Sequence, residues 1–517
     1  MKKNILSLAV AASAAGMATV ASAQMYLNEE GTGEALIFPF YSVQSGNDTY
    51  ISIVNTTNQT KAVKVRMIES VDSLETLDFN LYMSPQDHFS FAITADGEGA
   101  KLITADNSCT VPAIPEGGQS FSTLLWAVAA AETDAEANRE QVGYVEVIEM
   151  GQITAGSDTA ADILHAMTGD TAGTPGDCAQ LTTNWSVTAG TEGAWYAEAS
   201  AELVGAGGAN ASVGTTDFAA VWAGGGLYGT GTVINVAEGT AFGYDAKAIE
   251  DLVAAGSTGS VLHYPPGDTR PDFSDDAMAD TAVVNVNGVQ TTYTGNLGVN
   301  HGPVSALFMT GSVSNEYVVD TDINGLTDWV LNFPTKSNHL DANGDLTAPF
   351  SNTTTAAGTD LTALCQPVAI TGYDREEMTQ DPPTPGSDGP AFSPSTRPET
   401  TTTPDLLICN EVTVAHWGGA SATNTTADIT NGLANVSAYV DGWAAGWGVM
   451  DLESGNLNNT VDNTRELAGA VAGTTDLLAG LPVTGFAVVE YTNGVADTNV
   501  RNYQVAWEHK TDVITSD

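Results

Sequence analysis

The strongest hint of chemistry in the sequence is a run of oxygen-bearing side chains at alternate positions. Asp320, Asp322 and Asn324 are followed by a glycine, which is how the loop of an EF-hand calcium site begins. Asp328 stands at the ninth position of such a loop, but Leu331 occupies the twelfth, where a glutamate normally supplies two oxygens. The pattern therefore predicts an incomplete calcium site, with a plain Asx turn as the alternative.

Two further acidic segments could contribute to cation binding. One is Asp341–Asp345, and the other is 272–280, in which Asp275 and Asp276 are adjacent. Two neighbouring carboxylates are harder to keep charged without a cation. We therefore expect calcium at one or more places on the protein, although Asx-rich turns also form without metal.

No segment carries a convincing catalytic signature. The glycines of 224–229 match GxGxxG, but the following 232–236 favours a strand where a dinucleotide fold needs a helix. The seven histidines are scattered, and no HExxH, GxSxG or SxxK motif occurs. We predict that the protein is not an enzyme; a secreted hydrolase is the third alternative, because 63 acidic residues offer many carboxylate pairs.

The charge balance restricts the possible partners. Two of the 15 basic residues and none of the 63 acidic ones lie in 1–23, so the rest of the chain carries 13 − 63 = −50. With this charge we expect no nucleic-acid partner, because binding to a phosphate backbone depends on Lys and Arg. Lipopolysaccharide is expected as a partner only if divalent cations bridge its phosphates to the carboxylates of the protein. Adaptation to salty water is an alternative explanation of the acidic excess.

The first residues indicate export. A short basic start is followed by an apolar stretch at 5–20 and by Ala21, Ser22 and Ala23, which is typical of a signal peptide, so 1–23 is the predicted leader. No later apolar stretch is long enough for a transmembrane helix, so we expect no transmembrane segment.

The chain has four cysteines, Cys109, Cys178, Cys365 and Cys409. In an exported protein they are expected to form two disulfides, for which three pairings are possible. We expect the sequential pairing. The second disulfide would then close the base of a Pro/Thr-rich insertion at 374–405.

The alternation of β-branched and polar residues predicts a mostly β fold. Strands are expected throughout 31–93, at 142–153, at 281–286, 289–294, 312–319 and 327–334, and in the C-terminal part. Short helices are expected at 124–141, 159–167 and 245–256. The balance indicates a multi-domain, β-sandwich-like architecture. We place the domains at 24–190, 191–345 and 346–517.

Several strand segments resemble a known group of proteins. They are GTGEALIFPFYSV (31–43), SIVNTTNQTKAVKVRMIES (52–70), LDFNLYMSPQDHFSFAI (77–93), TDWVLNFPTK (327–336) and LPVTGFAVVEY (481–491). In these segments the chain is similar, from about 24 to 506, to acidic exported surface-layer (S-layer) proteins of marine gammaproteobacteria, which are shed into biofilm matrix.

This resemblance implies a structural role. It implies a protein at the surface of a Gram-negative bacterium whose copies assemble with one another into a two-dimensional lattice, with divalent-cation-dependent contacts and no catalytic residue. The alternative is an exported adhesin or ligand-binding surface protein, for which the 374–405 segment would offer a display loop.

Overall fold

The fold is described from a computed structural model of the chain. It describes residues 24–124, 139–169, 172–188, 191–196, 217–254, 256–257, 262–296, 299–341, 344–350, 365–377, 406–418, 421–423, 440, 442–453, 465–496 and 499–516. The predicted leader and most of the 374–405 insertion lie outside these residues. The predicted mostly β, sandwich-like architecture is confirmed: antiparallel sheets dominate, with a few short helices.

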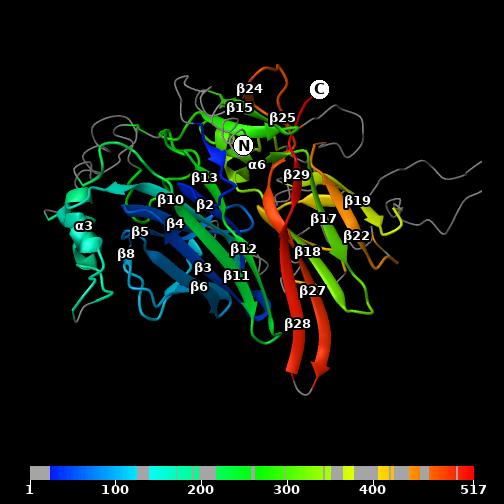
Figure 1. Cartoon of the computed structure of the whole chain (residues 1–517), viewed down its shortest axis with the longest axis horizontal. Helices are drawn as coiled ribbons and strands as arrows, with labels where there is room; N and C mark the ends of the chain where they lie inside the picture. Colours follow the sequence, from blue (N-terminus) through cyan, green and yellow to red (C-terminus); the bar gives the residue numbers. More distant parts are fainter. Residues whose placement is uncertain are drawn as a thin grey trace, which may run out of the picture.

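The first sandwich, drawn mainly in blue to green in Figure 1, packs a seven-stranded sheet against a six-stranded one. The seven-stranded sheet consists, in spatial order, of β1 (Tyr26–Leu27), β13 (Lys247–Glu250), β2 (Ala35–Ser42), β10 (Val142–Ile153), β4 (Thr60–Glu69), β5 (Glu75–Met83) and β8 (Cys109–Val111). The six-stranded sheet consists of β12 (Thr240–Asp245), β11 (Leu227–Asn235), β3 (Asn47–Asn55), β6 (His88–Asp96), β7 (Gly99–Ile103) and β9 (Gln119–Ser120).

Residue alternation builds this sandwich. In β3, β6 and β11 every second side chain is buried, so one face of the six-stranded sheet packs on the core and the other faces solvent. Strands β2, β4 and β10 are buried along their whole length because their sheet is covered on both faces. The core between the sheets is apolar and includes Phe38, Ile51, Val65, Phe79 and Phe91.

The second sandwich, at the other side of Figure 1, packs a five-stranded sheet against a four-stranded one. The five-stranded sheet consists of β20 (Leu406–Ile408), β19 (Gln366–Asp374), β22 (Ala445–Asp451), β17 (Ser312–Val318) and β29 (Lys510–Asp512). The four-stranded sheet consists of β21 (Val412–His416), β18 (Gly325–Asn332), β27 (Thr484–Ala496) and β28 (Asn499–Glu508). Its core holds Tyr317 stacked on Trp417, with Trp329 beside them.

Smaller sheets join the two sandwiches at the top of Figure 1. They are formed by β14 (Thr281–Val286), β15 (Val289–Gly295) and β24 (Gly469–Val471); by β16 (Met309–Thr310) and β26 (Leu481–Pro482); and by β23 (Glu466–Leu467), β25 (Leu478–Ala479) and β30 (Ile514–Thr515). Helix α6 (Gly302–Phe308) contacts β14 and β15 and is buried along its length.

Two other α-helices lie at the far edge of the first sandwich: α3 (Asp158–Ile163) and α4 (Cys178–Asn184). The short 3₁₀ turns are η1 (Gln44–Gly46), η3 (Arg139–Gln141) and η4 (Lys336–Asn338). Helix α3 overlaps the predicted 159–167. Most of the predicted helix at 124–141 lies outside the described residues. The helix predicted at 245–256 is wrong, because Lys247–Glu250 pairs with β2 on one side and β1 on the other.

Strand pairing crosses both internal boundaries that we placed from the sequence. Strands β11 to β13, from the predicted 191–345 domain, pair with β2 and β3 of the first sandwich. Strands β17 and β18, from the same predicted domain, pair with β22, β21 and β27 of the second sandwich. The middle of the chain therefore contributes strands to both sandwiches. Such pairing joins strands that are distant in the sequence, so local composition does not reveal it.

An apolar layer holds the sandwiches together. Phe40, Tyr144 and Phe242 of the first sandwich form one buried cluster with Val414 and Phe486 of the second. The rings of Phe40 and Phe486 are 6.3 Å apart in an edge-to-face arrangement. An apolar junction of this kind resembles the interior of a domain and favours a single rigid body.

Candidate functional site

The predicted calcium turn is the loop between β17 and β18. Asp320 Oδ1 accepts the N–H of Asp322 at 2.9 Å, and the Asp320 carbonyl oxygen accepts the N–H of Gly325 at 2.9 Å. Asn324 has a φ of 46°, in the left-handed region that asparagine tolerates. Asp320 Oδ2 lies 3.8 Å from the guanidinium of Arg375. The turn is closed by its own groups, and Asp322 is exposed to solvent.

Asp328 has a different role in the structure. Its side chain is fully buried on β18 and accepts from His416 Nδ1 at 2.8 Å, Ser421 Oγ at 2.9 Å, and the N–H and hydroxyl of Thr423, both at 2.8 Å. Burial opposes a charged His416 ring, but the hydrogen bond and charge of Asp328 outweigh it and raise the pKa of His416. The Asp328 carboxylate is thus occupied by protein donors, unlike that of Asp322.

The other acidic segments are also used by the chain itself. Asp341 Oδ1 accepts the N–H of Asp345 at 3.0 Å. Asp275 is buried and accepts the hydroxyl of Tyr264 at 2.7 Å, whereas its neighbour Asp276 is exposed. Across the part of the chain that the structure describes, no group of three or more His, Cys, Asp or Glu is arranged to hold a metal ion.

The basic residues show the most unusual distribution in the molecule. Thirteen Lys and Arg follow residue 23, and six of them are buried: Lys61, Lys64, Arg66, Arg139, Lys336 and Arg465. Lys and Arg are almost never buried without partners, so this concentration needs a structural explanation.

Ion pairs supply that explanation for four of the six, whereas Lys336 and Arg465 donate to backbone carbonyl oxygens. Lys61 Nζ is 2.7 Å from Glu149 Oε1, and neither side chain is exposed. Arg66 bridges Glu75 at 2.7 Å and Glu146 at 2.6 Å between neighbouring strands. Each of these buried cations is held against a carboxylate on an adjacent strand, which compensates part of the loss of hydration.

This arrangement leaves the solvent-facing surface strongly anionic. Among the side chains that the structure describes, six basic and nine acidic ones are buried, whereas the whole chain after residue 23 has 13 basic and 63 acidic residues. The nine buried acidic residues are Glu34, Glu69, Glu140, Glu146, Glu149, Asp275, Asp328, Glu411 and Glu490. Four more basic residues form ion pairs nearer the surface: Lys101, Lys247, Arg270 and Arg375. The ratio of acidic to basic side chains is therefore higher at the surface than in the whole chain.

One buried site has more carboxylates than cations. Glu34 accepts Trp222 Nε1 at 2.7 Å, close to the Lys61–Glu149 pair. Burial, followed by the charge of Glu149, raises the pKa of Glu34 to about 8. Burial, followed by nearby carboxylates, also raises the pKa of Glu250 to about 7. These groups exchange protons near neutral pH.

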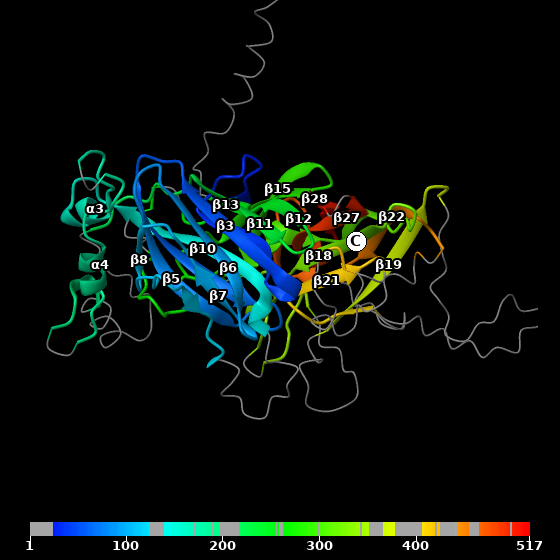
Figure 2. The same cartoon turned by 90° about the horizontal axis from the view of Figure 1, so that it is seen from below.

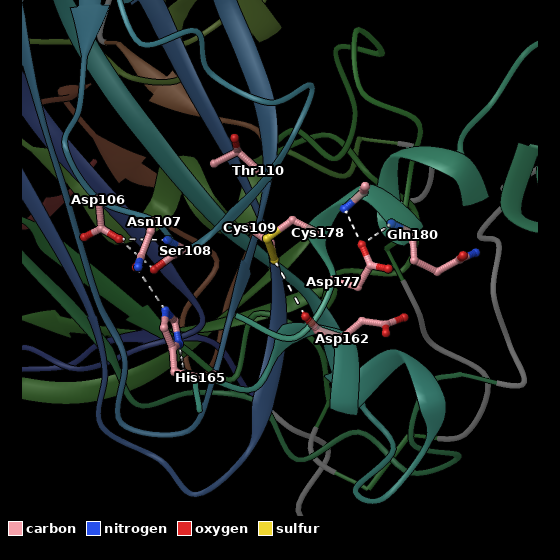
Figure 3. Close-up of a disulfide and its surroundings, with 12 residues drawn as sticks. Asp106, Asn107, Ser108, Cys109, Thr110, Asp162, His165, Asp177, Cys178 and Gln180 are labelled. Atoms are coloured by element: carbon pink, nitrogen blue, oxygen red, sulfur yellow. Dashed lines mark hydrogen bonds between the residues drawn. A yellow bond between two sulfur atoms is a disulfide. The ribbon is translucent and has the colours of Figure 1, made fainter. Parts of the chain in front are cut away.

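Both disulfides that we expected are present: Cys109–Cys178 and Cys365–Cys409. The first joins β8 to the start of α4 (Figure 3), with Cys109 Sγ 4.0 Å from the carbonyl oxygen of Asp162 at α3. The second links Cys365, directly before β19, to Cys409, directly after the paired strand β20, at the base of the predicted insertion. The first disulfide thus attaches α4 to the first sandwich, and the second links the two ends of the segment that contains the insertion.

Ser305 of α6 and His339, which directly follows η4, lie side by side. Ser305 Oγ is 2.9 Å from His339 Nε2 and donates to Thr335 Oγ1 at 2.9 Å. His339 Nδ1 contacts the carbonyl oxygen of Ala348 at 2.9 Å, and burial followed by His301 lowers the pKa of His339 to about 3. Ser305 and His339 are at most 1% exposed. The pair is part of a buried hydrogen-bond network between α6 and the segment that follows β18.

Exposed aromatic residues are a feature that sequence reasoning missed. Tyr503 and Trp507 on β28 are 60% and 43% exposed, and Tyr491 of β27 pairs with Tyr503. Figure 1 shows the red β27–β28 hairpin extending beyond the other strands of the second sandwich. The strand alternation of Tyr503 and Trp507 could have placed both on one face, but their exposure depends on which strands cover them.

A cleft of about 850 Å³ opens where the first sandwich, α6 and the C-terminal strands meet. Leu27, Leu307 and Val513 form apolar parts of its wall, and Lys247 Nζ joins Glu508 Oε1 at 2.8 Å across it. Its volume is in the range of small-molecule sites.

Comparison with known proteins finds no family model, no curated protein and no solved structure that matches this chain. Among the described residues, no helix is both long and apolar enough to cross a membrane.

Proposed function

We propose that this protein is an exported structural subunit of a surface layer, whose copies assemble into a two-dimensional lattice through contacts that need divalent cations. The observation that carries the proposal is the charge distribution. Six of thirteen basic side chains are buried, so the surface is dominated by carboxylates and two copies repel each other.

Divalent cations can reverse this repulsion. Monovalent salt screens exposed charges beyond about 8 Å at physiological ionic strength, whereas calcium coordinates several carboxylate oxygens directly. Asp322 presents an exposed carboxylate on a turn held in shape by Asp320. We expect a neighbouring copy to supply the ligands that this turn lacks, and the same chemistry to connect the layer to phosphates of lipopolysaccharide.

The rest of the architecture suits a structural subunit. The apolar junction makes the two sandwiches one block, and two disulfides fasten the segments at its edges. A lattice needs such blocks because flexible subunits would lose conformational freedom when they assemble, which weakens the contacts. The disulfides are compatible with an oxidising compartment outside the cytoplasm.

Sedimentation velocity tests this proposal whatever the symmetry of the lattice. Residues 24–517 would be compared in calcium chloride and in sodium chloride of equal ionic strength. We expect large assemblies in calcium that disappear when a chelator is added, and monomers in sodium. Equal assembly in both salts would show that screening is sufficient, and monomers in both would contradict self-assembly.

The alternative, an exported adhesin or ligand-binding surface protein, draws support from the cleft and from the aromatic residues Tyr503 and Trp507. Exposed aromatic side chains are frequent at binding surfaces. A protein that remains monomeric in calcium but binds intact cells, and loses this binding on Trp507→Ala, would favour this alternative.

A further inference from the structure

The outer face of the six-stranded sheet differs from the rest of the anionic surface. Over β3, β6 and β7, which lie next to one another (Figure 2), the outward side chains are small or uncharged with few exceptions. We call this surface the β3–β6–β7 face and define it by Asp48, Tyr50, Ala92, Thr94, Lys101 and Ile103. Tyr50 and Ile103 are 40% and 38% exposed.

The order of these residues has a symmetry about β6. Tyr50 pairs with Ala92, which in turn pairs with Ile103, so the two exposed apolar side chains flank a small residue. In the next row Thr94 pairs with Lys101 on one side. On the other side of β6, Thr49 pairs with Ile93, so Asp48, the residue before Thr49, lies opposite Thr94. Each row thus carries complementary groups at equal distances from β6.

We infer that the β3–β6–β7 face is a contact between two copies of this chain, related by a two-fold axis that runs along β6. This inference rests on the proposed self-assembly and specifies one of its contacts. Rotation about that axis places Asp48 of one copy over Lys101 of the other, and Tyr50 over Ile103. Both contacts occur twice, as an isologous interface requires.

Charge identifies a second copy as the occupant. The same two-fold rotation pairs opposite charges and apolar groups, whereas most of the remaining surface would bring carboxylates together. Strand spacings of about 4.8 Å and same-face residue spacings of about 6.8 Å give roughly 500 Å² from each copy when the neighbouring strands are included. Such an area is close to the lower limit for specific association, so the contact is expected to be weak alone and effective within a lattice.

One like-charge contact remains on the axis. Asp96, at the end of β6, faces outward and would meet Asp96 of the second copy. Its present partners are Ser120 Oγ at 2.6 Å and Lys101 Nζ at 3.8 Å. Association through this face should therefore be stronger in calcium than in sodium, since a divalent cation can neutralise the two carboxylates.

A charge-swap cycle tests the geometry. Asp48→Lys and Lys101→Asp, made separately, each bring like charges together across the axis, and the double variant restores opposite charges. We expect each single variant to weaken association in calcium by about tenfold, and the double variant to recover most of it. Asp48 and Lys101 lie on strands separated by β6, so rescue within one copy is not expected.

Sedimentation equilibrium of residues 24–517 measures these constants, with Lys510→Asp as the matched control on exposed β29. Circular dichroism and thermal unfolding check that every variant is folded. If the single variants have the same association constant as Lys510→Asp, the β3–β6–β7 face is not the contact. If the single variants weaken association but the double variant does not restore it, the two-fold geometry is wrong. A wild-type protein that stays monomeric in calcium overturns both this inference and the proposed function.

Discussion

Removing the cation of the buried Lys61–Glu149 pair should destabilise the first sandwich in a pH-dependent way. Lys61→Met leaves Glu149 unexposed, with the N–H of Gly225 at 3.0 Å as its other hydrogen-bond donor given by the structure. The lost attraction across 2.7 Å amounts to about 6 kcal/mol at an effective dielectric constant near 20. Part of this loss is offset, because the variant no longer buries an ammonium group.

Protonation limits the cost further. Burial raises the pKa of Glu149, and without Lys61 the carboxyl can take up a proton. Binding that proton at pH 7 costs about 1.4 kcal/mol for each pH unit above an ordinary glutamate pKa of about 4.3, or roughly 3–4 kcal/mol. We therefore expect Lys61→Met to lower the free energy of unfolding by about 3 kcal/mol at pH 7 and by about 1 kcal/mol at pH 5.

Urea unfolding followed by tryptophan fluorescence measures both values. Lys61→Met combined with Glu149→Leu should recover most of the loss, because apolar replacement of a whole buried pair is often tolerated. Lys101 has a side chain that is 30% exposed and an Nζ atom 3.8 Å from Asp96, so Lys101→Met should change stability by less than about 0.5 kcal/mol. A loss below about 1 kcal/mol at pH 7, or an equal loss at pH 5, would refute the reasoning.

Three other predictions follow from the same structure. Since the folded-state pKa of Glu34 is raised to about 8, with burial and then Glu149 as causes, its contribution to stability should fall as pH rises from about 4.5 to 8; Glu34→Gln should flatten the melting temperature over this window, and an unchanged profile would contradict it. Replacing Cys365 and Cys409 by serine removes the restraint on a 44-residue loop and should lower the free energy of unfolding by about 4 kcal/mol, measured by thermal or urea unfolding. A change near zero would mean that the pairing of β19 with β20 already restrains the loop and that the disulfide adds no stability. Asp322→Asn should reduce the number of calcium ions bound per assembled copy in equilibrium dialysis without altering the monomer's melting temperature; unchanged stoichiometry would exclude this turn.

The sequence predicts well what depends on local pattern. Alternation of buried and exposed residues in β3, β6 and β11 is visible in the letters, because one face of their sheet meets solvent. The pairing Cys109–Cys178 matches the simplest connection between neighbours in sequence. These features need no information about which strands lie side by side.

Features that depend on long-range pairing were not predictable. The segment Lys247–Glu250 has a helix-like composition, but β1 and β2 impose a strand on it. Asp328 matches a calcium-loop position, yet the approach of Ser421 and Thr423 from a distant segment satisfies its carboxylate. Tertiary contacts overrode local preference in both cases.

The concentration of cations inside the first sandwich is likewise hidden in the sequence. Lys64 and Arg66 look like the polar side of an exposed strand, whereas β4 lies between β10 and β5 and is covered on both faces. Only the fold shows that these charges are buried and that the acidic excess is left for the surface.

The most direct test of the account is electron microscopy of residues 24–517, first dialysed against a chelator and then returned to millimolar calcium. The account predicts dispersed particles with the chelator and ordered sheets with calcium, which dissolve again when calcium is removed. Dispersed single particles under both conditions at high protein concentration would contradict the central claim that carboxylates and divalent cations control self-assembly.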